Sequence, residues 1–349
     1  MKILIMRFSA LGDVAMVAPV VREYAAAHPD DDITVMSMPF CEPLFDDIAP
    51  NVRFLGKNIK KDYKGVWGLF RLFRELHSEH FDMVYDLHDV LRTKILRKYF
   101  RLYGYTVRKI DKHRKLRKLI TAQGDKKQLI QLPTSFENYK SVLSEPTPIK
   151  ASPLGGDKRG VEGVAGLFGI APFAAHLGKI YPLDKMQRVI ELLIERQPHC
   201  TIYLFGGGGK EKEKMQEWAR QFAGNVEVAS DCLNGGGMRA ELKLMQRLDC
   251  MVSMDSANMH LASLVGTRVV SIWGATHPYA GFLGWQQRMD DCVQVSLPCR
   301  PCSIYGNKPC LRKDFACMNQ ITPEMVVAKI LRNSIDATAD LSLRATKMR

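Results

Sequence analysis

Short apolar runs alternate with amphipathic segments along most of the chain. An apolar run of this kind predicts a buried strand, and apolar residues at helical spacing predict a helix. We expect strands at residues 2–6, 33–37, 52–55, 83–86, 165–171, 201–205, 251–253 and 268–273. We expect helices at residues 14–24, 65–77, 91–102, 183–196, 211–222, 238–248 and 256–265. The alternation predicts an α/β fold in which helices cover both faces of parallel sheets.

A stretch rich in Pro, Gly and small residues, at positions 145–163, interrupts this alternation. A chain of 349 residues also exceeds a typical single core, which favours two domains. We therefore expect two Rossmann-like, doubly wound domains that face a cleft, at residues 1–150 and 165–335. Residues 151–164 would form the linker, and the polar residues 336–349 a frayed tail.

The positive charge of the chain is concentrated in one region. The formal net charge is +13, and residues 92–127 alone hold 14 Lys and Arg against two Asp, a net +12. Such a region is typical of proteins that meet phosphate on nucleic acid, lipid or a phosphorylated glycan, although a merely solvated face is the plain alternative. Within it, the helix at 91–102 has a cationic face that could lie on anionic headgroups, made by Arg92, Arg97, Lys98 and Arg101.

Other features of composition narrow the class of protein. No recognisable nucleic-acid-binding signature accompanies the basic region, so we expect no nucleic-acid partner. No apolar run approaches the roughly 18 residues of a membrane span, and the chain opens on a strand, so we expect a cytoplasmic protein. Nine cysteines, an odd number, favour thiols or metal ligands over disulfides. Four of them could make a tetrahedral zinc site or a packed thiol cluster: Cys299, Cys302, Cys310 and Cys317.

Asp13 lies where the first predicted strand passes through a turn of small residues into a helix. Open α/β sheets bind ligands at this edge, outside the carboxyl ends of the strands. Asp is also a favoured residue at helix starts, so Asp13 could simply cap the helix.

Four segments in the second half have the chemistry of an anion-binding site. Lys179, before a predicted helix, can place a positive charge on a phosphate. The run FGGGGK, which includes Gly206 and Gly207, could bring backbone N–H groups close to a ligand, or could be a flexible turn. At Asp255, Ser256 and Ala257 a helix start exposes its first amides, while His260 lies a turn deeper. The loop GATHP, with Thr276, follows the next strand.

These segments together resemble the heptosyltransferase family of bacterial lipopolysaccharide glycosyltransferases, glycosyltransferase family 9. The resemblance rests on MRFSALGDV, APFAAHLGKIYP, MDSANMHLASLVGTRVVSIWGATHP and CRPCSIYGNKPCLRKDFACMNQITPEMV, in the family's order over nearly the whole chain. It departs from the family pattern at Tyr181 for tryptophan, Ala257 for glycine, and Ala275 and His277 for proline and aspartate.

The resemblance implies a glycosyltransferase-B fold and an inverting, metal-independent transfer that requires no cofactor. Asp13 would be the catalytic base, with Gly12 leaving room for the acceptor hydroxyl, and Lys179 would stabilise the leaving diphosphate. A nucleotide sugar, usually ADP-heptose, would bind at Lys179, Gly206, Gly207, Asp255, Ser256, Ala257, His260 and Thr276.

On this interpretation the acceptor is the lipopolysaccharide core or lipid A, and the protein is a monomer at the cytoplasmic face of the inner membrane. Three alternatives stay open. The chain could use another nucleotide sugar, could bind glycolipid without catalysis, or could bind nucleic acid through its basic region.

Overall fold

The computed structural model describes residues 1–143 and 166–332, so the predicted linker and tail lie outside the described residues. The chain divides into two compact units. Unit 1 contains residues 1–114 and 133–152, and unit 2 contains residues 115–132 and 153–349. Among the described residues, no helix is long and apolar enough to cross a membrane.

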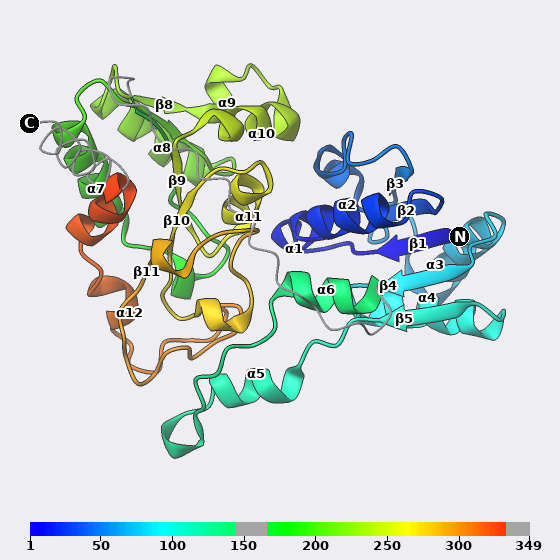
Figure 1. The fold of residues 1–349 in the computed structure, drawn as a ribbon. Helices are drawn as coiled ribbons and strands as arrows, with labels where there is room; N and C mark the ends of the chain where they lie inside the picture. Colours follow the sequence, from blue (N-terminus) through cyan, green and yellow to red (C-terminus); the bar gives the residue numbers. More distant parts are fainter. Residues whose placement is uncertain (144–165, 333–349) are drawn as a thin grey trace, which may run out of the picture. The chain divides into compact units, whose positions relative to one another are not determined.

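Unit 1 is built on a parallel sheet of five strands in the order β3-β2-β1-β4-β5 (Figure 1). Its strands are β1 (Lys2–Met6), β2 (Asp32–Ser37), β3 (Val52–Gly56), β4 (Met83–Asp86) and β5 (Thr106–Lys109). Its helices are α1 (Leu11–Ala15), α2 (Val17–Ala27), α3 (Gly65–His77), α4 (Leu91–Leu102) and α6 (Ser135–Leu143).

The two faces of this sheet are covered because its strands are apolar on both sides. Leu4 and Met6 of β1 belong to the same buried cluster as Phe73 of α3 and Phe100 of α4. The neighbours Ile3 and Ile5 are fully buried as well, and successive side chains of a strand point to opposite faces. Burial on both faces is what parallel strands between helices require.

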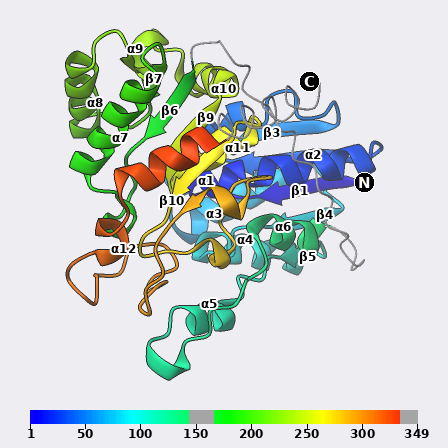
Figure 2. The same ribbon diagram turned by 60° about the vertical axis from the view of Figure 1, so that its left-hand side comes forward.

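Unit 2 repeats this plan with a parallel sheet of six strands in the order β11-β10-β9-β6-β7-β8. Figure 2 shows its central strands β7, β6, β9 and β10. Its strands are β6 (Leu167–Ala171), β7 (Thr201–Leu204), β8 (Val226–Val228), β9 (Cys250–Met254), β10 (Val269–Ile272) and β11 (Cys292–Val293). Its helices are α7 (Leu183–Arg196), α8 (Lys210–Gln221), α9 (Ala229–Cys232), α10 (Gly237–Arg247), α11 (Ala257–Leu264), α12 (Ala316–Asn319) and a last helix at 323–332.

In each sheet, the chain first adds strands on one side of the unit's first strand and then adds the others on its opposite side. The reversal lies between β1 and β4 in unit 1 and between β6 and β9 in unit 2. Ligands of doubly wound sheets bind beyond the carboxyl ends of the strands at such a switch point. The predicted fold class, two doubly wound α/β domains, is therefore confirmed, and each unit has one expected ligand edge.

One segment lies elsewhere than the expected domain boundaries imply. Residues 115–132, which include most of α5 (Arg114–Ile120), pack with unit 2 although they precede the end of unit 1 in the chain. Arg117 Nη1 donates to the hydroxyl of Tyr305 at 2.7 Å, and Leu132 N donates to the carbonyl of Tyr279 at 2.9 Å. Long-range packing of this kind leaves no mark in local periodicity.

Candidate functional site

The ligand edge of unit 1 begins with an ion pair that follows β1. Arg7 Nη2 lies 2.7 Å from Asp13 Oδ2, and Arg7 Nη1 donates to the carbonyl of Leu87 at 2.6 Å. Asp13 Oδ2 also accepts from Ala10 N at 3.0 Å, so its carboxylate does cap the start of α1. The Asp13 side chain keeps 26% of its surface exposed, whereas that of Arg7 keeps 8%. Capping and access to a ligand are therefore compatible at Asp13.

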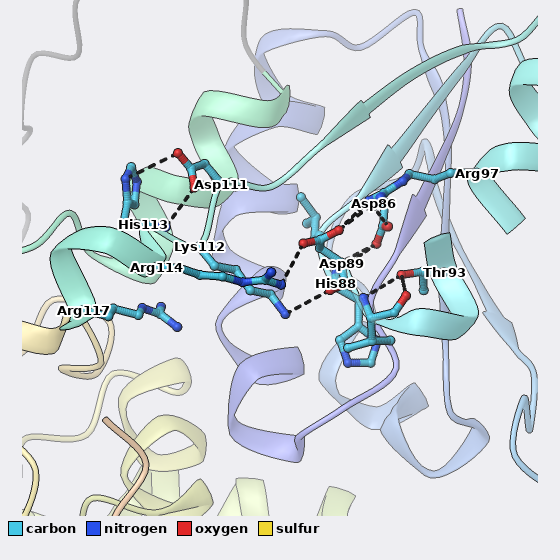
Figure 3. Close-up of polar contacts among 12 residues, drawn as sticks. Asp86, His88, Asp89, Thr93, Arg97, Asp111, Lys112, His113, Arg114 and Arg117 are labelled. Atoms are coloured by element: carbon cyan, nitrogen blue, oxygen red, sulfur yellow. Dashed lines mark hydrogen bonds and ion pairs between the residues drawn. The ribbon is translucent and has the colours of Figure 1, made fainter. Parts of the chain in front are cut away.

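A second charged network follows β4, the strand across the switch point (Figure 3). Asp86 is fully buried and accepts from the backbone of His88 at 2.9 Å and Asp89 at 3.0 Å. Arg97 of α4 donates to Asp86 at 2.6 Å and to Asp89 at 3.0 Å. Burial alone would raise the pKa of Asp89, but the bonds from Arg97 hold it below its ordinary value. The loop after β4 is thus fixed by buried charges.

Two cations reach this loop from the segment after β5. Figure 3 shows Lys112 and Arg114 extending toward Asp89, where Arg114 Nη2 lies 3.2 Å from a carboxylate oxygen and Lys112 Nζ lies 3.4 Å from the carbonyl oxygen. Burial lowers the pKa of Lys112, and the charges of Arg7 and Arg114 lower it further. Crowded cations favour a bound anion, because an anion would relieve their repulsion.

His88 lies among these cations as a neutral imidazole. Its Nε2 is 3.3 Å from Ser9 Oγ, while its Nδ1 is buried without a hydrogen-bond partner among the described residues. Burial, followed by the charges of Arg7 and Lys112, lowers its pKa from 6.5 to about 3. An unpaired buried nitrogen is costly, and His88 holds one beside Ser9 and near the charges of Arg7 and Asp13.

The native pKa of His88 predicts a pH-dependent stability. The pKa of His88 is about 3 in the native protein and ordinarily 6.5. In the pH window between these two values, His88 is therefore protonated in the unfolded chain but not in the native protein. The free energy of unfolding should therefore fall as pH drops through the window, by up to about 1.4 kcal/mol per pH unit. Denaturant unfolding of wild type and His88→Gln across this range should give a shallower fall for the variant. Parallel curves would contradict the assignment.

The ligand edge of unit 2 is centred on a buried ion pair. Lys179 ends the short turn Leu177–Lys179, and Asp255 directly follows β9. The Lys179 Nζ lies 2.9 Å from Asp255 Oδ2. The side chains are only 15% and 5% exposed. Two residues proposed separately from the sequence therefore meet at the switch point between β6 and β9.

The helix that follows this pair begins as expected. Ser256 is the N-cap of α11 and its hydroxyl lies 3.1 Å from that of Ser253. Ala257 opens the helix and is not among the described residues with positive φ, so alanine fits where the family has glycine. His260 is buried one turn further along.

The loop after β10 contains Thr276 and is held by an arginine that the sequence did not single out. The buried Arg300 guanidinium donates to the carbonyls of Gly274 at 2.6 Å and Thr276 at 3.1 Å. It also donates to the carbonyl of Trp273 at 3.1 Å. Thr276 itself is fully buried, and its hydroxyl lacks a hydrogen-bond partner among the described residues. Arg300 thus fixes the backbone around a buried hydroxyl, and a donor-binding role for Thr276 stays a prediction.

Gly306 was also missed, and it packs on the stem of Lys179. Its φ is +75°, and a Cβ at this position would lie 2.6 Å from Lys179 Cγ. Gly306→Ala should lower the free energy of unfolding by more than the about 1–2 kcal/mol of a positive φ, because Lys179 must also move. Gly224→Ala is the matched control, since Gly224 has φ +93° and no neighbour within 4 Å. Equal losses in the two variants would contradict the contact.

The glycine run after β7 is placed differently from the expectation of a free phosphate cradle. Gly207 N donates to Glu211 Oε2 at 2.7 Å, so this amide already has a partner. A Cβ at Gly206 would lie 2.9 Å from Met215 and 3.1 Å from Phe173, so Gly206 is needed for packing. Local structure accounts for both glycines, and a donor-binding role for them stays a prediction.

The acceptor and membrane residues expected in unit 1 divide into buried and exposed positions. Gly12 is a buried residue of α1. Arg97 is buried and paired with Asp86 and Asp89, so the expectation that it contacts the acceptor or a membrane is corrected. Its charge pattern matched an exposed face, but two buried carboxylates turn it inward. Arg92, Lys98 and Arg101 are exposed.

The four clustered cysteines line one cavity of about 10 Å³, room for about one water molecule. The members are Cys299, Cys302, Cys310 and Cys317, all of them free thiols. Burial raises the pKa of Cys317 to about 11, which favours the neutral thiol. Within residues 1–143 and 166–332, no three His, Cys, Asp or Glu side chains are arranged to hold a metal ion. The choice between a zinc site and a packed thiol cluster stays a prediction.

Asp13 and Lys179 belong to different units, so their predicted opposition across a cleft stays a prediction. The sequence pattern did not single out Arg7, His88 and Lys112, although they share one signal. Each lies just beyond a strand of the first sheet, where a polar side chain reaches the ligand edge.

Comparisons with known proteins agree with the resemblance. Residues 148–309 match the model of glycosyltransferase family 9 (heptosyltransferase). A lipooligosaccharide heptosyltransferase 2 from Campylobacter jejuni is 28% identical over 137 residues, 38% of this chain and 41% of that protein. The aligned part thus spans about two fifths of this relative.

Two solved structures share the fold over nearly the whole chain. An E. coli ADP-heptose lipopolysaccharide heptosyltransferase II is 18% identical, with a TM-score of 0.66, covering 97% of this chain and 100% of that one. An E. coli heptosyltransferase solved with ADP-2-deoxy-2-fluoro heptose is also 18% identical, with a TM-score of 0.65 and coverages of 95% and 100%. The glycosyltransferase-B type of fold is therefore confirmed.

Proposed function

We propose that this chain, a glycosyltransferase of family 9, transfers heptose from ADP-heptose to the core of lipopolysaccharide. The observation that carries the proposal is the Lys179–Asp255 pair at the switch point of the second sheet. It joins two motifs that the family resemblance identifies as donor-binding. The structural relative bound to an ADP-heptose analogue supports the choice of donor.

In the proposed reaction, Asp13 takes the proton of an acceptor hydroxyl while the oxygen attacks the anomeric carbon of the donor. The bond from that carbon to the diphosphate oxygen breaks, and ADP leaves from the opposite face, so the anomeric configuration inverts. Asp13 suits this role because Arg7 holds its carboxylate in place at 2.7 Å while a quarter of its side-chain surface stays accessible.

The departing diphosphate needs positive charge in place before it leaves. Lys179 supplies a cation held by Asp255 and by packing against Gly306, and the first amides of α11 lie beside it. Preorganised donors of this kind stabilise developing charge without reorganisation. We propose that they make a metal ion unnecessary.

The acceptor side has cations beside the proposed base. Arg7, Lys112 and Arg114 lie around the loop after β4, and the buried His88 lies among them. An acceptor with acidic groups near the reacting hydroxyl fits this edge. We propose that the lipopolysaccharide core is such an acceptor. We propose that the enzyme works as a monomer at the cytoplasmic face of the inner membrane, in peripheral contact with anionic lipid.

A thermal-shift panel of nucleotide sugars tests the donor. ADP-heptose should raise the unfolding midpoint, because a ligand that binds only the native state stabilises it. UDP- and GDP-sugars should leave the midpoint unchanged. A shift by a UDP-sugar in place of ADP-heptose would replace the proposed donor while keeping the glycosyltransferase assignment.

A further inference from the structure

The segment at residues 115–132, here called the strap, packs with unit 2 although the chain returns to unit 1 directly after it. Two of its cations bind one loop of unit 2. Arg117 Nη1 donates to the hydroxyl of Tyr305 at 2.7 Å, and Lys127 Nζ donates to the carbonyl of Pro301 at 3.0 Å. These acceptors lie 188 and 174 residues further along the chain, beyond β11. A strap that precedes the second sheet in sequence thus covers a loop that follows its last strand.

Arg117 is placed to fix the ring of Tyr305. Its guanidinium carbon lies 5.9 Å from the centre of that ring and 5.2 Å from the centre of the Phe282 ring. The two ring centres are themselves 5.9 Å apart. A guanidinium stacks well on aromatic faces while its N–H groups keep their hydrogen bonds. Because Tyr305 is otherwise 47% exposed, these contacts are what give its ring a fixed position.

Gly306 follows Tyr305 directly and lies along the stem of Lys179. A Cβ built on Gly306 would lie 2.6 Å from Lys179 Cγ, 3.2 Å from Cδ and 3.1 Å from Cε. The carbonyl oxygen of Gly306 also packs on Gly178, where a Cβ would lie 3.0 Å from it. A lysine has a flexible four-carbon stem, so a backbone wall along three of its carbons restricts where the ammonium group can go.

We propose that Arg117 is a positioning residue, which fixes Tyr305 and the adjoining turn so that Lys179 meets the departing diphosphate. Asp255 holds the ammonium group at 2.9 Å, and the turn at Gly306 holds the stem. The geometry has to be tight, because a misplacement of about 1 Å can cost about 100-fold in rate. The inference rests on the proposed function, since it takes Lys179 as the cation for that diphosphate.

Acylation of lysines measures the placement of Lys179 without any assay of transfer. Its side chain is 15% exposed in the native protein, so an acylating reagent should label it slowly. Arg117→Met removes the cation and the hydrogen-bond donor and keeps an apolar stem. It should raise the rate of Lys179 acylation several-fold, as read by peptide mass spectrometry. The matched control Lys118→Met, at an exposed cation of the same helix, should label like wild type.

Turnover at a temperature where every variant is folded separates positioning from a merely structural role. Arg117→Met should lower kcat about tenfold and leave the KM of the acceptor unchanged, a smaller loss than the about 10²–10³ expected for Lys179→Met. Arg117→Lys keeps a cation that can donate to Tyr305, so it should restore part of kcat. In a Tyr305→Phe background, Arg117→Met should lower kcat less than in wild type, because residues that act through one contact are not additive.

Each contrary result would overturn the inference in a different way. Equal labelling of Lys179 in wild type and Arg117→Met would show that the strap does not place this lysine. A raised acceptor KM with an unchanged kcat would make Arg117 an acceptor contact. Faster labelling with an unchanged kcat would show that the strap covers the lysine without serving the reaction. Wild-type turnover in Lys179→Met would overturn the proposed role of Lys179 as well, and so tells the two failures apart.

Discussion

Replacing Asp13 with asparagine is expected to lower the turnover of heptosyl transfer by about 10²–10⁴-fold, the range of a general base. Asparagine keeps an oxygen that can accept from Ala10 N, so the cap of α1 survives while the basic carboxylate is lost. The measurement is ADP release at saturating donor and acceptor.

Donor binding provides the control for Asp13→Asn. The variant should show the same thermal shift with ADP-heptose as wild type, because Asp13 belongs to unit 1 and the proposed donor site to unit 2. A variant that is folded, binds donor and still turns over at the wild-type rate would show that Asp13 only caps its helix.

Lys179→Met is expected to affect both stability and chemistry. The variant leaves Asp255, whose side chain is 5% exposed, without its cation, and breaking a buried pair in this way costs about 3–5 kcal/mol. It also removes a donor for the leaving diphosphate, for which a loss of about 10²–10³ in turnover is expected.

The double variant Lys179→Met, Asp255→Asn separates the two effects. It removes both charges, so most of the free energy of unfolding should return, as measured by denaturant unfolding. Turnover should stay low, because no cation has been restored. Recovery of activity together with stability would mean that the pair is purely structural.

The core elements of both sheets were predictable because their apolar runs are long and continuous. Residues 2–6 and 83–86 were expected as strands and are β1 and β4, and residues 65–77 and 183–196 were expected as helices and are α3 and α7. Short elements such as β8 and β11 were missed, since three or two residues carry too little pattern. Their pairing depends on neighbours distant in sequence.

The candidate site was predictable only where a motif stands out locally. Asp13, Lys179 and Asp255 follow strands in recognisable turns, and the last two do pair. Arg300 and Gly306 could not be found this way, because their roles depend on tertiary packing. The carbonyls that Arg300 binds lie 24 to 27 residues away in the chain, and the lysine stem that Gly306 contacts lies more than 100 residues away. The inward turn of Arg97 was hidden for the same reason, since a charge pattern does not reveal Asp86 beneath it.

The most direct test of the proposed function is mass spectrometry of a heptose-deficient lipopolysaccharide core incubated with ADP-heptose and the purified chain. We predict that wild type adds the mass of one heptose in the presence of a chelator, that NMR of the product shows an inverted anomeric configuration, and that Asp13→Asn adds heptose at least about 100-fold more slowly. A wild-type protein that binds ADP-heptose but leaves every core acceptor unmodified, or an Asp13→Asn variant that adds heptose as fast as wild type, would contradict the account.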